Sequence, residues 1–210
     1  MKKEKIILVL NGILPKKDKL YKILKGYDKI FCADGAANKV INSNINPNYI
    51  LGDLDSVNLT IIKNKKYQII NLPNQNFNDF QKILVWLKNK KYKALDIIGI
   101  DGKRLDHTIG NFHILIDEVN NFNLTVFTEF GIFYTVIKKR IFNDCNNKYF
   151  SIFSKNKINK INSSGLKYEL KNKTFKNLQE GTLNIAIKNN VTIKSEENIL
   201  VYISNKPKKN

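Results

Sequence analysis

The chain has 210 residues, of which 42% are hydrophobic and 10% aromatic. This length and composition are sufficient for a buried core, so they exclude an intrinsically disordered protein and predict a globular one. The formal net charge of +18 is compatible with nucleic-acid binding, but the lysines are scattered among many Asn and Ile residues without a basic cluster. That mixture favours a coding bias toward A and T over an evolved nucleic-acid-binding surface.

The rare residue types narrow the interpretation further. The only arginines are Arg104 and Arg140, and in a lysine-rich chain we expect an arginine where lysine does not suffice. Cys32 and Cys145 lack metal-ligand spacing, which favours buried free thiols over a disulfide. The apolar run at residues 6–10 is too short for a signal peptide or a membrane span, so we expect a cytoplasmic protein that does not enter membranes.

The first 128 residues alternate strand-like and helix-like segments. Hydrophobic patterns predict strands at residues 5–10, 29–33, 49–51, 67–71, 94–100 and 124–128. Helices are predicted at residues 18–25, 35–42 and 105–119, and a further one is capped by Asn78 and carries Phe80, Ile83, Leu84 and Leu87. This alternation predicts a parallel sheet covered by helices, whose ligand sites lie at the carboxyl ends of the strands.

From about residue 134 the pattern changes to short apolar runs separated by Asn, Lys, Ser and Gly. Strands are predicted at residues 149–153, 165–170, 182–188, 191–194 and 199–203, with a frayed end at 205–210. We therefore expect an α/β fold in two parts: an N-terminal parallel-sheet domain over residues 1–135 and a C-terminal antiparallel β-sandwich over residues 136–210.

The densest chemical signal is Gly52-Asp53-Leu54-Asp55-Ser56, which directly follows a predicted strand. Two carboxylates placed there suit magnesium, which takes one or two protein carboxylates together with substrate phosphates. The alternative is a turn in which Asp55 or Ser56 caps the next helix.

A second signal, Gly99-Ile100-Asp101-Gly102-Lys103-Arg104-Leu105-Asp106-His107, spans a predicted strand-to-helix turn. Amide donors at a helix N-terminus bind phosphate, and Arg104 can hold phosphate oxygens in a bidentate fork. The alternative is that Asp106 and His107 only stabilise the first turn of the helix.

Two further segments are open to both a structural and a functional interpretation. Small residues in Cys32-Ala33-Asp34-Gly35-Ala36-Ala37-Asn38 allow a ligand close to the backbone, or simply close packing of helix on sheet. In Pro73-Asn74-Gln75-Asn76-Phe77-Asn78-Asp79, the last residue opens a helix and could act through the helix dipole alone.

Taken in order, these segments resemble the thiamine pyrophosphokinase family over nearly the whole chain. The family pattern runs Asp-Gly-Gly/Ala-Ala-Asn, Gly-Asp-Phe/Leu-Asp-Ser, Asp-x-Thr-Asp and Gly-Gly-Arg-x-Asp-His-x-x-Gly-Asn. The resemblance implies transfer of pyrophosphate from ATP to thiamine by a homodimer, with an ATP-binding catalytic domain followed by a thiamine-binding sandwich.

The resemblance also implies roles for single residues. Magnesium and catalysis fall to Asp53, Asp55 and Asp79, with Arg104 and Asp106 also catalytic. The nucleotide pocket would include Asp34, Asn38, Gln75, Arg104 and His107. Thiamine would contact Ser164, within Ser164-Gly165-Leu166-Lys167-Tyr168, and Asn184, within Gly181-Thr182-Leu183-Asn184.

Four positions depart from the family pattern. Asn76 and Asn78 replace Asp and Thr before Asp79, Lys103 replaces the second Gly before Arg104, and Leu183 replaces a Ser. Weaker ordering of the metal is expected from Asn76, and a changed thiamine contact from Leu183. Two alternatives remain: a pyrophosphokinase of the same fold acting on another small alcohol such as a pterin, and a basic nucleic-acid-binding protein.

Overall fold

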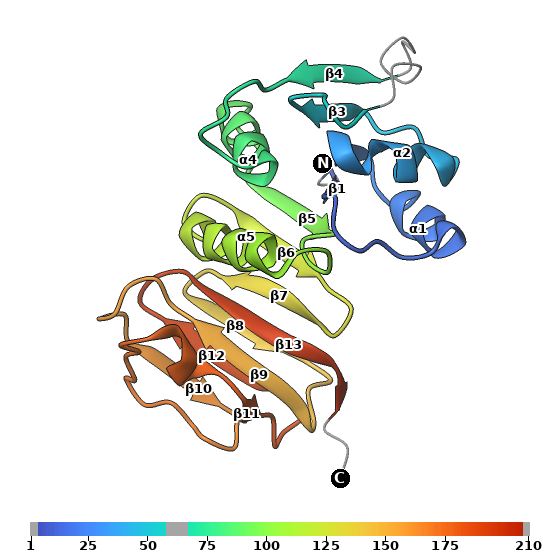
Figure 1. The fold of residues 1–210 in the computed structure, drawn as a ribbon. Helices are drawn as coiled ribbons and strands as arrows, with labels where there is room; N and C mark the ends of the chain where they lie inside the picture. Colours follow the sequence, from blue (N-terminus) through green and yellow to red (C-terminus); the bar gives the residue numbers. More distant parts are fainter. Residues whose placement is uncertain (1–3, 58–66, 208–210) are drawn as a thin grey trace. The chain divides into compact units, whose positions relative to one another are not determined.

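The computed structural model describes residues 4–57 and 67–207, and the chain divides into two compact units, Met1–Asn111 and Phe112–Asn210 (Figure 1). Each unit is described by itself. No helix in the described ranges is both long enough and apolar enough to cross a membrane.

The first unit is a parallel sheet with helices. Its strands are β1 (Ile6–Val9), β2 (Lys29–Ala33), β3 (Tyr49–Gly52), β4 (Gln68–Asn71) and β5 (Ala94–Ile98), in the order β5-β1-β2-β3-β4. All of these strands pair in parallel. The helices are α1 (Lys17–Leu24), α2 (Asp34–Asn42), α4 (Asp79–Asn89) and α5 (Leu105–Glu118), of which the last continues into the second unit.

Continuous apolar sequence explains why β1 and β2 lie at the centre of this sheet. Ile7, Leu8 and Val9 are fully buried, as expected for a parallel strand covered on both faces. Helices α2 and α4 both pack on β2 and β3, and Figure 1 shows them on opposite sides of the sheet. Each expected strand and helix of this unit is found, with ends shifted by at most two residues.

The second unit consists of antiparallel strands in two layers. Its strands are β6 (Asn123–Phe127), β7 (Gly131–Val136), β8 (Lys139–Phe142), β9 (Lys148–Phe153), β10 (Ile161–Ser164), β11 (Asn184–Ile185), β12 (Val191–Ser195) and β13 (Ile199–Pro207), with a short 3₁₀ helix η1 (Leu178–Gly181). One layer has the order β11-β9-β13-β7-β6 and the other β10-β12-β8. Buried side chains from both layers share one core, among them Phe150, Val201, Ile161 and Val191. The expected fold class, a parallel α/β part followed by antiparallel strands, is confirmed.

Several predictions for the second unit are wrong. Residues 165–170 do not form a strand: only Leu166 makes an isolated bridge, to Ala186, because Gly165 turns the backbone with φ +90°. The strand expected at 182–188 is reduced to β11. At the C-terminus, β13 extends through Pro207, which pairs with Lys148, so residues 205–207 are not frayed; residues 208–210 lie outside the described residues.

Candidate active site

A cleft of about 370 Å³ opens at the carboxyl ends of the strands in the first unit. From β1 the chain builds the sheet outward through β2, β3 and β4, and then returns to place β5 on the other side of β1. Ligands of open parallel sheets bind where the strand order reverses in this way. The segments that follow β1 and β5 both line the cleft, at residues 10–12 and 99–101, together with the starts of α4 and α5.

Two glycines bring these segments together at the floor of the cleft. The Gly12 amide donates to the Gly99 carbonyl at 2.7 Å, and the Ile13 amide donates to the Asp101 carbonyl at 2.8 Å. A Cβ on Gly12 would lie 2.3 Å from the carbonyl oxygens of Gly99 and Asp101, and a Cβ on Gly99 would lie 2.3 Å from the Leu10 oxygen. Glycine is therefore a steric requirement at both positions.

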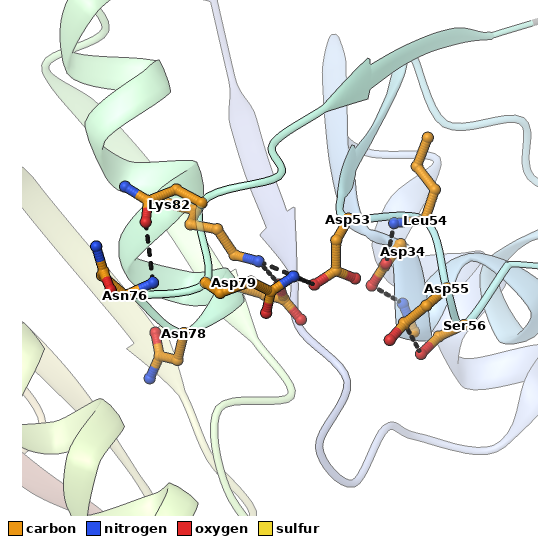
Figure 2. A network of polar contacts seen from close by, with 12 residues as sticks. Asp34, Asp53, Leu54, Asp55, Ser56, Asn76, Asn78, Asp79 and Lys82 are labelled. Atoms are coloured by element: carbon orange, nitrogen blue, oxygen red, sulfur yellow. Dashed lines mark hydrogen bonds and ion pairs between the residues drawn. The ribbon is translucent and has the colours of Figure 1, made fainter.

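Three carboxylates gather beside the cleft. Oxygens of Asp34, Asp53 and Asp55 lie within 4.8 Å of one another, close enough to share one cation. Asp34 opens α2, whereas Asp53 and Asp55 follow β3. The two following carboxylates are brought to the same side because Leu54 between them has a left-handed backbone, with φ 69°. The side chains of all three are drawn in Figure 2.

Asp34 is the buried member of this group, with 1% of its surface exposed. Its carboxylate accepts hydrogen bonds from the Gly35 amide and, at 2.9 Å, from the Leu54 amide. Gly52 makes room for it, since a Cβ there would lie 2.4 Å from the Asp34 carboxyl carbon. Burial, followed by the charges of Asp79 and Asp53, raises the pKa of Asp34 to about 6. Like charges held this close favour a bound cation.

Lys82 joins the carboxylates of two loops. Its ammonium lies 2.8 Å from Asp79 Oδ1 and 3.2 Å from Asp53 Oδ2, as Figure 2 shows. Only 4% of its side chain is exposed. The hydrogen bond from Lys82 is the main reason that the pKa of Asp53 is held below its usual value. In turn, hydrogen bonds to Asp79 and Asp53 raise the pKa of Lys82 against the opposing effect of burial.

The residues around the start of α5 lie at the wall of the cleft. Arg104 and His107 line it, and the Arg104 guanidinium forms a two-pronged ion pair with Asp106, with Nε 3.1 Å from Oδ1. This pair, together with the His107 amide, lowers the pKa of Asp106 to about 2. Arg104 is largely exposed, so its side chain can exchange Asp106 for a phosphate without losing buried contacts.

The structure brings most of the predicted site residues of this unit together. Asp53, Gln75, Asp79, Arg104 and His107 line the cleft. Asp34 and Asp55 do not line the cleft but lie next to Asp53, which does. Asp106 is likewise bound to Arg104 at the cleft wall. Asn38 lies in the second turn of α2 and does not line the cleft, so its role in a nucleotide pocket stays a prediction.

The two predicted thiamine contacts lie in neighbouring segments of the second unit. The Lys167 amide donates to the Ile185 carbonyl at 2.8 Å, which pairs the two family-like motifs side by side. Asn184 is buried, and its amide group bonds the backbone of Tyr168 and Ile185, so it holds this turn in place. Ser164, at the end of β10, is exposed, and the role of both residues toward thiamine stays a prediction.

Sequence reasoning missed two residues of the cleft. Lys82 stands among the apolar positions of its helix, which hides it, although its i,i+3 spacing from Asp79 is the spacing of a helical ion pair. Asn11 lies two residues after the end of β1, so the rule that ligand sites follow strands could have found it. Its side-chain oxygen accepts a 2.6 Å hydrogen bond from Lys103, the residue that replaces the family's second glycine.

Fold and cleft together define an α/β enzyme in which acidic and basic side chains gather where the strand order reverses. The family model "Thiamin pyrophosphokinase, catalytic domain" matches residues 20–127, and "Thiamin pyrophosphokinase, substrate-binding domain" matches residues 131–202. The chain belongs to the thiamin pyrophosphokinase family. The two family models end and begin at residues 127 and 131, and the domain boundary expected at residue 135 stays a prediction.

Individual relatives agree with this assignment. The chain is 29% identical over 97 residues to "Thiamin pyrophosphokinase 1" of Caenorhabditis elegans, a match that covers 42% of this chain and 40% of that protein. The chain therefore spans well under half of that curated relative. The solved thiamine pyrophosphokinase of Bacillus subtilis has a TM-score of 0.74 at 21% identity and covers 96% of this chain and 98% of its own. For the yeast enzyme the TM-score is 0.76 at 20% identity, with 97% and 87% covered.

Proposed function

We propose that the chain transfers a pyrophosphate group from ATP to the hydroxyl group of thiamine, giving thiamine diphosphate and AMP. The observation that carries the proposal is the cluster of Asp34, Asp53 and Asp55 beside a cleft that also contains Lys82 and Arg104. Hard carboxylate oxygens facing a phosphate-sized space, opposite basic side chains, suit a nucleotide that is bound with a divalent cation.

The donor set fits magnesium. All candidate ligands are carboxylate oxygens. Burial, together with the charges of Asp79 and Asp53, raises the pKa of Asp34, and a bound cation would stabilise its charged form. Asp53 and Asp55 would hold the ion together with Asp34, and Asp79, which Lys82 ties to Asp53, would assist from the start of α4. When bound, magnesium supplies neutralisation of phosphate charge.

In the proposed reaction the thiamine hydroxyl oxygen forms a bond to the β-phosphorus of ATP. The bond from that phosphorus to the oxygen shared with the α-phosphate breaks, AMP leaves with that oxygen, and the hydroxyl proton is released. Negative charge spreads over the oxygens of the transferred group, where Arg104 and Lys82 can stabilise it from the cleft wall. Catalysis would rest on positioning and electrostatics more than on covalent chemistry.

The substrate assignment rests on the second unit. The substrate-binding domain model covers residues 131–202, which favours thiamine over a pterin or another small alcohol. We further propose that the protein acts as a homodimer, as the family resemblance implies. Light scattering at assay concentration tests this, and a monomer that is fully active would contradict it.

The deciding experiment incubates the pure protein with ATP, magnesium and thiamine and measures AMP and thiamine diphosphate by chromatography. Asp55→Asn is expected to abolish product formation while circular dichroism stays unchanged, because Asp55 is exposed and its loss removes a ligand without opening the core. Asp18→Asn, an exposed change on α1, is the matched control and should keep full activity. Wild-type AMP release by Asp55→Asn would remove this residue from the site, and product from a pterin but not from thiamine would overturn the substrate.

A further inference from the structure

A second cavity, of about 270 Å³, lies wholly within the second unit and is lined by none of the residues assigned to the proposed reaction. Strands β7, β8 and β13 and the turn at residues 143–148 form its walls. Among its lining residues are Tyr134, Arg140, Lys148 and Ser204.

Arg140 is the unusual feature of this cavity, and it is one of only two arginines in the chain. Its guanidinium carbon lies 4.3 Å from the centre of the Tyr134 ring and 5.2 Å from that of Phe142. Stacking of this kind holds the flat guanidinium group by its faces and leaves its N–H edge available. The side chain is thus fixed in place before any ligand arrives.

The charge of Arg140 is not balanced by a carboxylate. Across residues 4–57 and 67–207, no ion pair or hydrogen bond of its guanidinium is found, whereas Arg104 pairs with Asp106. Burial lowers the pKa of Arg140, which shows that its charge is partly removed from water. A desolvated cation without a partner carries a free-energy cost that an anionic ligand can offset.

The remaining lining strengthens this positive character. Lys148 supplies a second basic side chain, and no Asp or Glu from the described part of the chain lines the cavity. Asn143 and Ser204 add polar groups at the same walls. A half-buried guanidinium fork next to an ammonium is the donor set that recognises phosphate groups.

We propose that this cavity binds a small phosphorylated compound through its phosphate group, with Arg140 as the anchor and Lys148 as a supporting charge. The volume exceeds that of a bare phosphate ion, so there is room for a small attached organic group. Thiamine does not fit these requirements, because its thiazolium ring is positively charged and would face two cations. The cavity is therefore not suited to thiamine, and it lies apart from the cleft in which ATP is proposed to bind.

The chain offers a direct test, because a protein with two arginines gives two Nε–H signals in a ¹H–¹⁵N NMR spectrum. Arg140→Met removes one signal and so assigns both. Titration with inorganic phosphate, and separately with glycerol phosphate, is expected to shift the Arg140 signal along a saturating curve with an affinity in the millimolar range or tighter. Tighter binding of the ester than of phosphate would identify a phosphorylated compound as the ligand, and equal binding would identify free phosphate.

Lysine variants distinguish phosphate binding in the cavity from a general effect of the protein's positive charge. Lys148→Met should weaken the titration roughly threefold to tenfold, as loss of one nearby charge in a partly desolvated site predicts. Lys139→Met, which removes an exposed charge from β8, the strand of Arg140, should leave the titration unchanged. Potassium chloride at equal ionic strength should give no saturating shift. If phosphate moved only the Arg104 signal, or moved the Arg140 signal no more than chloride does, the proposal would be wrong.

Discussion

Lys82 shows how one side chain can organise a site made from separate loops. Its ammonium is buried on α4, and its ion-pair partners among the described residues are Asp79, at the start of that helix, and Asp53, which directly follows β3. The lysine therefore fixes the distance between two loops that must present their carboxylates together.

Replacing Lys82 by Met should expose the repulsion between Asp53 and Asp79. We expect a loss of about 1–2 kcal/mol in the free energy of unfolding, because both carboxylates keep some access to water. Turnover should fall by roughly tenfold or more, since a cation at the transferred group is lost. Urea unfolding and the AMP assay measure the two effects. Lys88→Met, on the exposed face of the same helix, serves as control, and equal behaviour of both variants would contradict this role.

The reactivity of Cys32, which lies in β2, reports how well the sheet is buried. Both cysteines are buried and free, as expected from the sequence. Burial raises the pKa of the Cys32 thiol above its ordinary value of 9.0, so the unfolded chain ionises first. Above about pH 9 the thiol is ionised in the unfolded chain but stays protonated in the folded protein. The free energy of unfolding should therefore fall as the pH rises above this value.

Native protein at pH 8 should therefore resist alkylation of Cys32 by iodoacetamide, whereas protein in guanidinium should incorporate label at both cysteines. Mass spectrometry counts the labels. Rapid labelling of Cys32 in the native state would show that β2 opens far more readily than a fully buried strand should.

At the scale of elements, helix α4 depends on Asn78, the capping residue that directly precedes it. Asn78 caps the helix by accepting a 2.9 Å hydrogen bond from the Gln81 amide, and its amide nitrogen donates to Asn111 at 3.2 Å. The cap decides where the helix begins and hence where Asp79 points relative to the cleft.

Asn78→Ala should cost about 1 kcal/mol of stability, the usual effect of losing a cap. It should also lower turnover, because the first turn of α4 carries Asp79. Asn78→Thr restores a capping hydroxyl and should recover most of both quantities. Thermal unfolding and the AMP assay provide the measurements, and a Thr variant as impaired as the Ala variant would exclude capping as the cause.

The elements that the sequence predicted well are those with strong local patterns. The parallel strands and the α4 cap could be identified because apolar runs and capping residues act over a few positions. The prediction of a strand at residues 165–170 failed for the opposite reason: β10 ends at Ser164, Gly165 turns the backbone, and Leu166 forms its bridge with Ala186, twenty positions away. The position of Lys82 between Asp53 and Asp79 likewise depends on tertiary packing that spacing alone does not encode.

At the scale of the whole molecule, the chain combines two units that each have their own core. All described carboxylates near the cleft belong to the first unit, so binding of a nucleotide with its metal should act on the stability of that unit. The second unit contributes the separate cavity around Arg140.

ATP together with magnesium should raise the unfolding temperature. At a ligand concentration near one hundred times the dissociation constant, the free energy of unfolding should increase by about 3 kcal/mol. ATP with EDTA should give a much smaller shift, because the phosphate charges then meet Asp53 and Asp55 without a cation between them. Differential scanning fluorimetry compares the two conditions. Equal shifts with and without magnesium would argue against a metal at the carboxylate cluster.

The contact between Gly12 and Gly99 also reaches beyond the protein, to the gene that encodes it. The abundance of Lys, Asn and Ile indicates drift toward codons made of A and T, yet neither glycine has space for even a methyl group. Every glycine codon begins with two guanines. Because no other residue fits at these two positions, the codons for Gly12 and Gly99 must keep their two guanines despite the drift toward A and T.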